Sequence, residues 1–233
     1  MPEPTVTAEP GALPAAVLWD MDGTLVDTEP LWYAAEQALA ARYGVPWTDA
    51  DSDALVGMPP DVYGGAMVAL GVRAPVEAVV GELVEVVRAA LLADLSWQPG
   101  VLELLGELVA AGVPCAMVTM SYRSLAEPVA AGAPPGTFAV LVTGDEVTHG
   151  KPHPEPYLRA AGALGVAIED CVAIEDSPPG ISSAMASGAR TIGVPHMVPV
   201  ERRPGLSRMP SLAGVRLSDL ARVHAGEVLD LIR

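Results

Sequence analysis

From Pro99 onward the chain alternates regularly between helical and extended patterns, and this alternation limits the possible folds more than any other feature. Each helical pattern is followed by a short apolar run typical of a buried strand. Helices are predicted at 99–111, 154–164, 178–187 and from about 218, with a shorter one after 119, and strands at 113–119, 138–143, 171–174 and 190–194. An earlier apolar run, 15–19, adds a strand that ends at Asp20. Strands that alternate with helices predict an α/β fold with a doubly wound parallel sheet.

One connection in this pattern is too long for a simple crossover. Thr28 is predicted to cap a helix that reaches about Tyr43, and roughly 75 residues then precede the strand end at Thr119, whereas a whole βαβ unit needs about 30. We therefore expect a small helical domain inserted over residues 29–95, above the strand ends where such sheets bind ligands. The predicted catalytic core comprises 15–28 and 96–233, and the Pro- and Glu-rich residues 1–14 are predicted to be a disordered tail.

The charge of the chain restricts its partners. The formal net charge of −16 would repel nucleic acid and anionic membranes, so neither is an expected partner. No apolar run reaches the roughly 18 residues of a membrane span, and the first residues do not resemble a signal peptide. Cys115 and Cys171 lie in apolar runs and are predicted to be buried, unpaired core residues. We expect a cytoplasmic protein that acts as a monomer.

Two aspartates follow the first predicted strand. Asp20 and Asp22 are spaced i, i+2, so an extended backbone would place both carboxylates on the same side. Two carboxylates this close repel each other unless a cation lies between them or one remains protonated. One of them would then serve as a metal-bound nucleophile and the other as a proton donor. The alternative is a plain turn that ends the strand.

Three further sites near strand ends carry complementary chemistry. Thr119 ends one strand, and its hydroxyl and the amide of Met120 are available to a phosphate oxygen. Glu175 and Asp176 end another strand, and adjacent carboxylates suit a hard cation such as Mg²⁺. Lys151, the only lysine in the chain, supplies a compact positive charge for phosphate. Carboxyl ends of parallel strands share one edge, so the sequence predicts metal-assisted phosphoryl transfer there.

Together these sites resemble the motifs of a known family, the haloacid dehalogenase-like hydrolases. The matching segments are Asp20–Asp27, Thr119, Gly150–Pro154 and Glu175–Ser177. The inserted helical segment resembles the cap of a group that includes β-phosphoglucomutase, phosphoglycolate phosphatase and the hexose or hexitol phosphatases. This resemblance implies a Rossmann-like core and an enzyme that acts on a small phosphorylated metabolite.

The resemblance also implies roles for individual residues. Asp20 would be the nucleophile that forms an aspartyl-phosphate, and Asp22 would protonate the leaving alcohol and then activate water. Thr119 and Lys151 would hold the transferring phosphoryl group.

The same resemblance implies a magnesium site. Mg²⁺ would be held by Asp20, the backbone carbonyl of Asp22 and Asp176, with Glu175 beside it.

Differences within the family favour a phosphatase. Asp22 favours ester cleavage over dehalogenation, and the inserted segment has no lysine for the Schiff base of phosphonoacetaldehyde hydrolases. Gly57, in the cap loop, is expected to contact substrate. Val56 and Pro60 stand around it where the mutases carry Lys and Arg, and Trp32 stands where they carry His. This loop therefore offers no charge for a second phosphate.

The expected substrate is a sugar or polyol phosphate. The run Asp27–Trp32 and the cap loop 56–58 are most similar to that branch, although helix capping and cap packing would also explain them. The alternatives are a phosphosugar mutase, a phosphoglycolate phosphatase and a non-catalytic protein that binds a phosphorylated metabolite.

Other polar residues are expected to lie outside the site. Three arginines in the predicted loop 196–211 could steer an anion, but a plain surface loop is favoured. The residues expected at the surface are Arg123, His149, His153, Arg202, Arg203 and Arg208.

Overall fold

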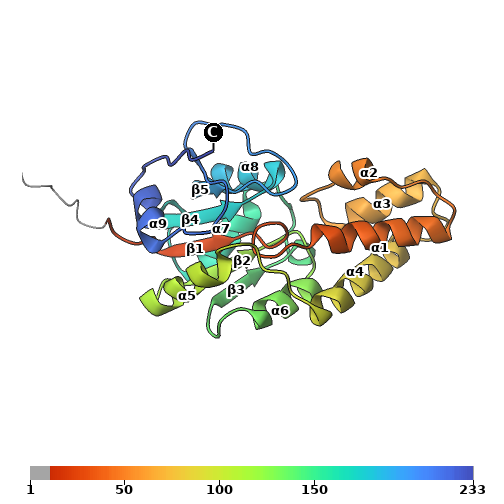
Figure 1. The fold of residues 1–233 in the computed structure, drawn as a ribbon, viewed down its shortest axis with the longest axis horizontal. Helices are drawn as coiled ribbons and strands as arrows, with labels where there is room; N and C mark the ends of the chain where they lie inside the picture. Colours follow the sequence, from red (N-terminus) through yellow and green to blue (C-terminus); the bar gives the residue numbers. More distant parts are fainter. Residues whose placement is uncertain (1–10, 233) are drawn as a thin grey trace, which may run out of the picture.

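A six-stranded parallel sheet forms the centre of the computed structural model, which describes residues 11–232 (Figure 1). The strand order is β3-β2-β1-β4-β5-β6, and every neighbouring pair is parallel. The strands are β1 (Ala16–Trp19), β2 (Cys115–Val118), β3 (Phe138–Val142), β4 (Cys171–Glu175), β5 (Arg190–Gly193) and β6 (Leu206–Arg208). The predicted doubly wound parallel sheet is confirmed.

Helices cover both faces of this sheet because its central strands are apolar on both sides. Val17 and Trp19 of β1 belong to the cluster that includes side chains of α5 (Val101–Ala111), α6 (Arg123–Gly132) and α9 (Leu217–His224). Ala16 and Leu18 pack in a second cluster with α7 (Glu155–Leu164) and α8 (Pro178–Ser187). Two short 3-10 turns, Gly144–Glu146 and Ile168–Asp170, complete these connections.

A four-helix segment is inserted between β1 and β2, and we call it the helical insertion. It consists of α1 (Glu29–Arg42), α2 (Asp49–Asp53), α3 (Pro60–Leu70) and α4 (Val76–Ala93). Figure 1 shows these helices grouped beyond one end of the sheet. Their shared core includes the buried side chains of Leu39, Met67, Leu83 and Val87. Within residues 11–232, no helix has the length and apolarity needed to cross a bilayer.

The segment 196–211, predicted to be a loop, contains β6. Three residues are too few to give a recognisable strand pattern, but they pair with β5 through Thr191, Ile192 and Gly193. Arg208 on β6 is buried and donates two hydrogen bonds to Asp230, at 3.0 and 2.7 Å. The prediction that Arg208 lies at the surface is therefore wrong.

The predicted disordered tail, residues 1–14, falls largely outside the described residues. Its last part, from Gly11, runs along α9, where the Ala12 carbonyl accepts a hydrogen bond from the His224 ring at 3.0 Å. Pro14 is buried.

A buried carboxyl group links α1 to α2 in the helical insertion. The Glu36 carboxyl accepts hydrogen bonds from the Ser52 hydroxyl and, at 3.1 Å, from Trp47 Nε1. Its other oxygen, Oε1, is buried without a hydrogen-bond partner among the described residues. Burial raises the pKa of Glu36 from 4.5 to about 7, although the Ser52 and Trp47 hydrogen bonds oppose the increase.

The raised pKa of Glu36 predicts that stability falls as pH rises. Between about pH 4.5 and pH 7 the unfolded state releases the Glu36 proton while the folded state retains it, so the free energy of unfolding decreases. The decrease should be about 3 kcal/mol, since one pKa unit corresponds to about 1.4 kcal/mol. Glu36→Gln should remove this contribution, as measured by urea unfolding at pH 5 and pH 8. Glu85→Gln, at an exposed position, is the control. An unchanged pH difference in Glu36→Gln would contradict the prediction.

Candidate active site

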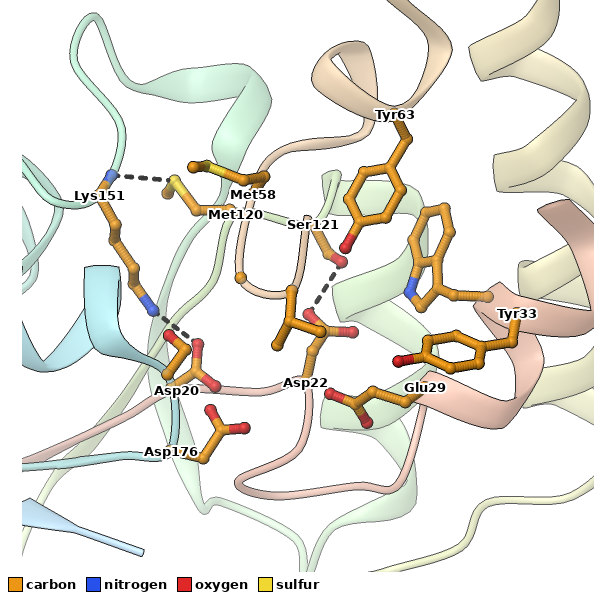
Figure 2. A pocket seen from close by; sticks show the side chains of 14 residues that line it. Asp20, Asp22, Glu29, Tyr33, Met58, Tyr63, Met120, Ser121, Lys151 and Asp176 are labelled. Carbon is orange, nitrogen blue, oxygen red and sulfur yellow. Dashed lines mark hydrogen bonds and ion pairs between the residues drawn. The ribbon is translucent and has the colours of Figure 1, made fainter. Parts of the chain in front are cut away.

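Most of the predicted residues from the strand ends line one pocket at the carboxyl edge of the sheet (Figure 2). Thr119 and Glu175 do not line it, but they contact Asp22 and Lys151 of its wall. The core contributes Asp20, Asp22, Lys151 and Asp176 to its wall. The helical insertion covers the opposite side with Glu29, Trp32, Tyr33, Val56, Gly57, Met58 and Tyr63. The space enclosed between these two sides is narrow, about 40 Å³.

Lys151 lies between two carboxylates at the base of this pocket. Its ammonium donates to Asp20 Oδ1 at 2.6 Å, to Glu175 Oε1 at 2.5 Å and to the Val118 carbonyl at 2.8 Å. Burial alone would lower the pKa of Lys151, but the charges of Asp20 and Glu175 outweigh it and raise the pKa. The lysine therefore stays protonated and is fixed beside the Asp20 carboxylate.

Glu175 anchors this lysine. Its carboxylate is fully buried and also accepts hydrogen bonds from the Tyr157 hydroxyl at 2.6 Å and the Ser177 hydroxyl at 3.2 Å. Tyr157, on α7, is likewise fully buried. Both Glu175 oxygens are thus engaged in fixing Lys151 and the loop that leads into α8.

Gly180, in the first turn of α8, leaves the space that the Glu175 carboxylate occupies. A Cβ at position 180 would lie less than 3.0 Å from both Glu175 oxygens. Gly180→Ala should therefore displace Glu175, lower the free energy of unfolding by about 2 kcal/mol or more, and reduce activity. Gly162→Ala is the matched control, because a Cβ at that position of α7 meets nothing within 4 Å. It should stabilise the protein by about 1 kcal/mol. Equal effects of the two substitutions would contradict this account.

Three hydroxyl groups hold the Asp22 carboxylate. Thr28 donates to Oδ1 at 2.7 Å, while Thr119 and Ser121 each donate to Oδ2 at 2.9 Å. Thr28 occupies the N-cap position of α1, as predicted, but its side chain makes no capping hydrogen bond. The hydroxyl serves Asp22 instead. The role of Thr119 and Met120 toward phosphate remains a prediction.

The acidic residues of the pocket have the composition of a divalent cation site. Asp20, Glu175 and Asp176 each offer an oxygen, and these oxygens lie within 4.8 Å of one another. Asp176 Oδ1 accepts a hydrogen bond from Thr24 at 3.3 Å, whereas Oδ2 is buried with no hydrogen-bond partner in the described residues. Burial, and then the neighbouring carboxylates, raise the pKa values of Asp20 and Asp176. A hard cation such as Mg²⁺ would compensate this surplus negative charge, so these residues fit it.

Gly23 allows the loop after Asp22 to approach this acidic cluster closely. Its φ of +78° is in the left-handed region, and a Cβ there would lie less than 3.0 Å from the Asp176 carboxylate.

The other polar residues considered from the sequence do not line the pocket. Arg123 pairs with Glu146 at 2.7 Å, and the exposed rings of His149 and His153 lie 4.7 Å apart. Arg202 pairs with Asp230 at 2.9 Å, and Arg203 donates to the Ser182 hydroxyl at 2.8 Å. Three residues of the pocket wall were not expected there from the sequence, namely Tyr33, Tyr63 and Ser121.

Fold and pocket together define a Rossmann-like α/β protein with an acidic site, containing one lysine, beneath a helical insertion. Comparison with known proteins agrees with that description. The haloacid dehalogenase-like hydrolase model matches residues 14–188. The chain therefore belongs to the haloacid dehalogenase-like hydrolases, as its sequence motifs predicted.

The similar proteins include two phosphatases and one solved structure. A phosphorylated carbohydrates phosphatase of Thermotoga maritima is 34% identical over 78% of this chain and 85% of its own length. Hexitol phosphatase A of Escherichia coli is 33% identical over 76% of this chain and 81% of its own length. The crystal structure of CbbY from Rhodobacter sphaeroides in complex with phosphate superposes with a TM-score of 0.81 at 27% identity, covering 89% of this chain and 99% of CbbY.

Proposed function

We propose that this protein is a Mg²⁺-dependent phosphatase that hydrolyses a small sugar or polyol phosphate through an aspartyl-phosphate. The observation that carries the proposal is the junction of Asp20, Lys151 and Asp176 in one buried cluster, with Asp22 facing the same pocket. Family membership and the named activities of similar phosphatases support it.

In the first half-reaction, a carboxylate oxygen of Asp20 attacks phosphorus while the bond from phosphorus to the leaving oxygen breaks. Asp22 gives its proton to the departing alkoxide, so an alcohol leaves. Lys151 is held at 2.6 Å from Asp20 and is positioned to balance negative charge on the phosphoryl oxygens. When bound, Mg²⁺ would neutralise further phosphoryl charge, with Asp20, Asp176 and the Asp22 backbone carbonyl as its proposed protein ligands.

In the second half-reaction, the Asp22 carboxylate takes a proton from water, and the oxygen of that water attacks phosphorus. The bond from phosphorus to the Asp20 oxygen breaks, which releases inorganic phosphate and restores both aspartates. The hydroxyls of Thr28, Thr119 and Ser121 fix the orientation of Asp22 for this transfer.

The charge of the pocket favours a phosphatase over a mutase. A mutase must hold a second phosphate, and Lys151 is the only cationic side chain among the described residues of the pocket wall. The segment α1–α4 acts in this proposal as a cap whose loop, with Gly57, contacts the leaving group. We also propose a monomer that acts in the cytoplasm, where the free thiols of Cys115 and Cys171 would stay reduced.

A panel of phosphate esters tests the proposed function. Release of inorganic phosphate from sugar or polyol phosphates should require Mg²⁺ and stop when EDTA removes it. A sugar 1-phosphate that yields a 6-phosphate rather than free phosphate would establish a mutase instead. Binding of esters without turnover of any of them, at saturating Mg²⁺, would establish a non-catalytic protein.

A further inference from the structure

We propose that Glu29 is a specificity-determining residue that restricts the leaving group to neutral polyhydroxy compounds and excludes those with a carboxylate or second phosphate. The inference rests on the proposed phosphatase activity and adds a rule about charge to its substrate class. It concerns the part of the pocket formed by Glu29, Trp32, Tyr33 and Tyr63, which we call the leaving-group wall.

Glu29 lies close to the reacting groups. It is the first residue of α1, and its carboxylate points toward Asp22 in Figure 2. A Cβ on Gly23 would lie 2.9 Å from Glu29 Oε1 and also against the Asp176 carboxylate, so these two carboxylates flank the same glycine. Because Glu29 and Asp20 line the same pocket, we expect a substrate whose phosphoryl group lies at Asp20 to extend its leaving group toward Glu29.

The charge of Glu29 is not fully compensated by its neighbours. His196 Nε2 lies 3.2 Å from Glu29 Oε2, but the same nitrogen donates to Asp27 Oδ1 at 3.0 Å. His196 Nδ1 accepts from the Gln98 amide at 3.2 Å, which leaves a single ring N–H for two carboxylates. Glu29 Oε2 accordingly has no well-aligned hydrogen bond within residues 11–232. Even a protonated His196 would leave this trio with a net charge of −1.

Burial raises the pKa of the Glu29 carboxyl, and a second anion beside it would raise the pKa further. An anionic leaving group therefore costs either charge repulsion or uptake of a proton.

The remainder of the pocket offers no compensation for such an anion. Its wall carries the carboxylates of Asp20, Asp22, Glu29 and Asp176 but, among the described residues, only the ammonium of Lys151. That ammonium is already bound to Asp20 and to Glu175. The phosphoryl group of the substrate is itself an anion, and the positive charges of Lys151 and of a bound cation are needed to balance it.

The leaving-group wall is suited to a sugar or polyol instead. Trp32 and Tyr63 stack with ring centroids 5.6 Å apart at an interplanar angle of 20°, and their side chains are nearly buried. Flat aromatic surface suits the C–H groups of a carbohydrate, while a carboxylate accepts hydrogen bonds from hydroxyl groups. The negative charge of Glu29 would thus favour hydrogen bonds from the hydroxyl groups of a neutral polyol, and the same charge would repel an anionic leaving group.

Matched ester pairs test this rule at saturating Mg²⁺. Glycerol 3-phosphate and 3-phosphoglycerate differ only in replacement of one CH₂OH by a carboxylate, as do glucitol 6-phosphate and 6-phosphogluconate. The wild-type enzyme should prefer the neutral member of each pair at least about tenfold in kcat/KM. Glu29→Gln keeps the shape and removes the charge, so it should reduce that ratio by about tenfold, mainly through faster turnover of the acidic ester.

The controls separate this inference from the proposed function. The rates of each variant are normalised to its rate with p-nitrophenyl phosphate. Glu85→Gln, an acid-to-amide change at an exposed position, should leave the ratio of neutral to acidic ester unaltered. Equal turnover of both members of each pair, or an unchanged ratio in Glu29→Gln, would overturn the role of Glu29 while leaving a phosphatase. If no ester is hydrolysed, the proposed function fails. Calorimetric titration would then compare the affinities for the neutral and the acidic ester of each pair, which tests the role of Glu29 through binding alone. Equal affinities would then overturn it.

Discussion

Asp20→Asn is expected to lower kcat by about 10⁴-fold or more, the largest effect of any substitution considered. An amide is a poor nucleophile and cannot form the aspartyl-phosphate, although it retains the shape of the side chain. Phosphate release from the best ester of the panel measures the loss. Asp94→Asn, at an exposed position after α4, is the control and should retain wild-type turnover. Retention of even a tenth of wild-type kcat in Asp20→Asn would contradict the assignment of the nucleophile.

The same variant has a second expected outcome, which separates chemistry from folding. Burial, together with Glu175, raises the pKa of Asp20, so the folded protein without metal disfavours the ionised carboxylate. The uncharged amide of the Asp20→Asn variant removes the cost of burying this charge, but it also loses the ion pair with Lys151, so the variant should stay folded in EDTA with a melting temperature near that of the wild type. Thermal melts with and without Mg²⁺ measure this stability. The cation should raise the melting temperature of the wild type more than that of the variant. A variant that unfolds well below the wild type in EDTA would show that lost turnover reflects lost structure.

Lys151→Arg is expected to have the second-largest effect, lowering kcat/KM by about 10³-fold and destabilising the protein although it conserves charge. The ammonium makes three hydrogen bonds of 2.5 to 2.8 Å, and only 2% of the side-chain surface is exposed. A planar guanidinium is wider and cannot meet all three acceptors without moving Asp20 or Glu175. Kinetics and urea unfolding measure the two effects.

The control for Lys151→Arg is the opposite exchange at a surface position. Arg73→Lys changes an exposed residue and should alter neither activity nor stability. Near-normal kinetics in Lys151→Arg would show that any cation serves at this position. Lost activity with unchanged stability would place the defect in phosphoryl transfer rather than in packing.

The core and its acidic cluster could be predicted because they depend on local apolar patterns and on the rule that parallel strands end at the same edge of a sheet. The central strands are buried on both faces and read as continuous apolar runs, so their ends are visible in the sequence. Trp19 is level with Met117 on one side and with Ile174 on the other, which brings the residues that follow these strands to one edge. The convergence of Asp20 with Asp176 thus follows from parallel register alone.

Other residues in and around the pocket could not be predicted in this way. Tyr63 reaches the pocket only through the placement of α3 over the sheet edge, and nothing in its local pattern distinguishes it from an ordinary core tyrosine. Ser121 and Thr28 look like turn and cap residues until the fold brings their hydroxyls to Asp22. The strand β6 was not predicted because its three residues show no strand pattern of their own. It is stabilised by pairing with β5 and by the hydrogen bonds of Arg208 to Asp230.

The burial of the sole lysine has a practical consequence for experiments in solution. Acylating and reductively alkylating reagents modify amines that solvent can reach, and the only lysine amine of this chain is enclosed by carboxylates. Its labelling rate therefore reports how often this pocket opens to solvent, with no background from other lysines. Protection by a slowly released product analogue would provide an occupancy assay that requires no turnover.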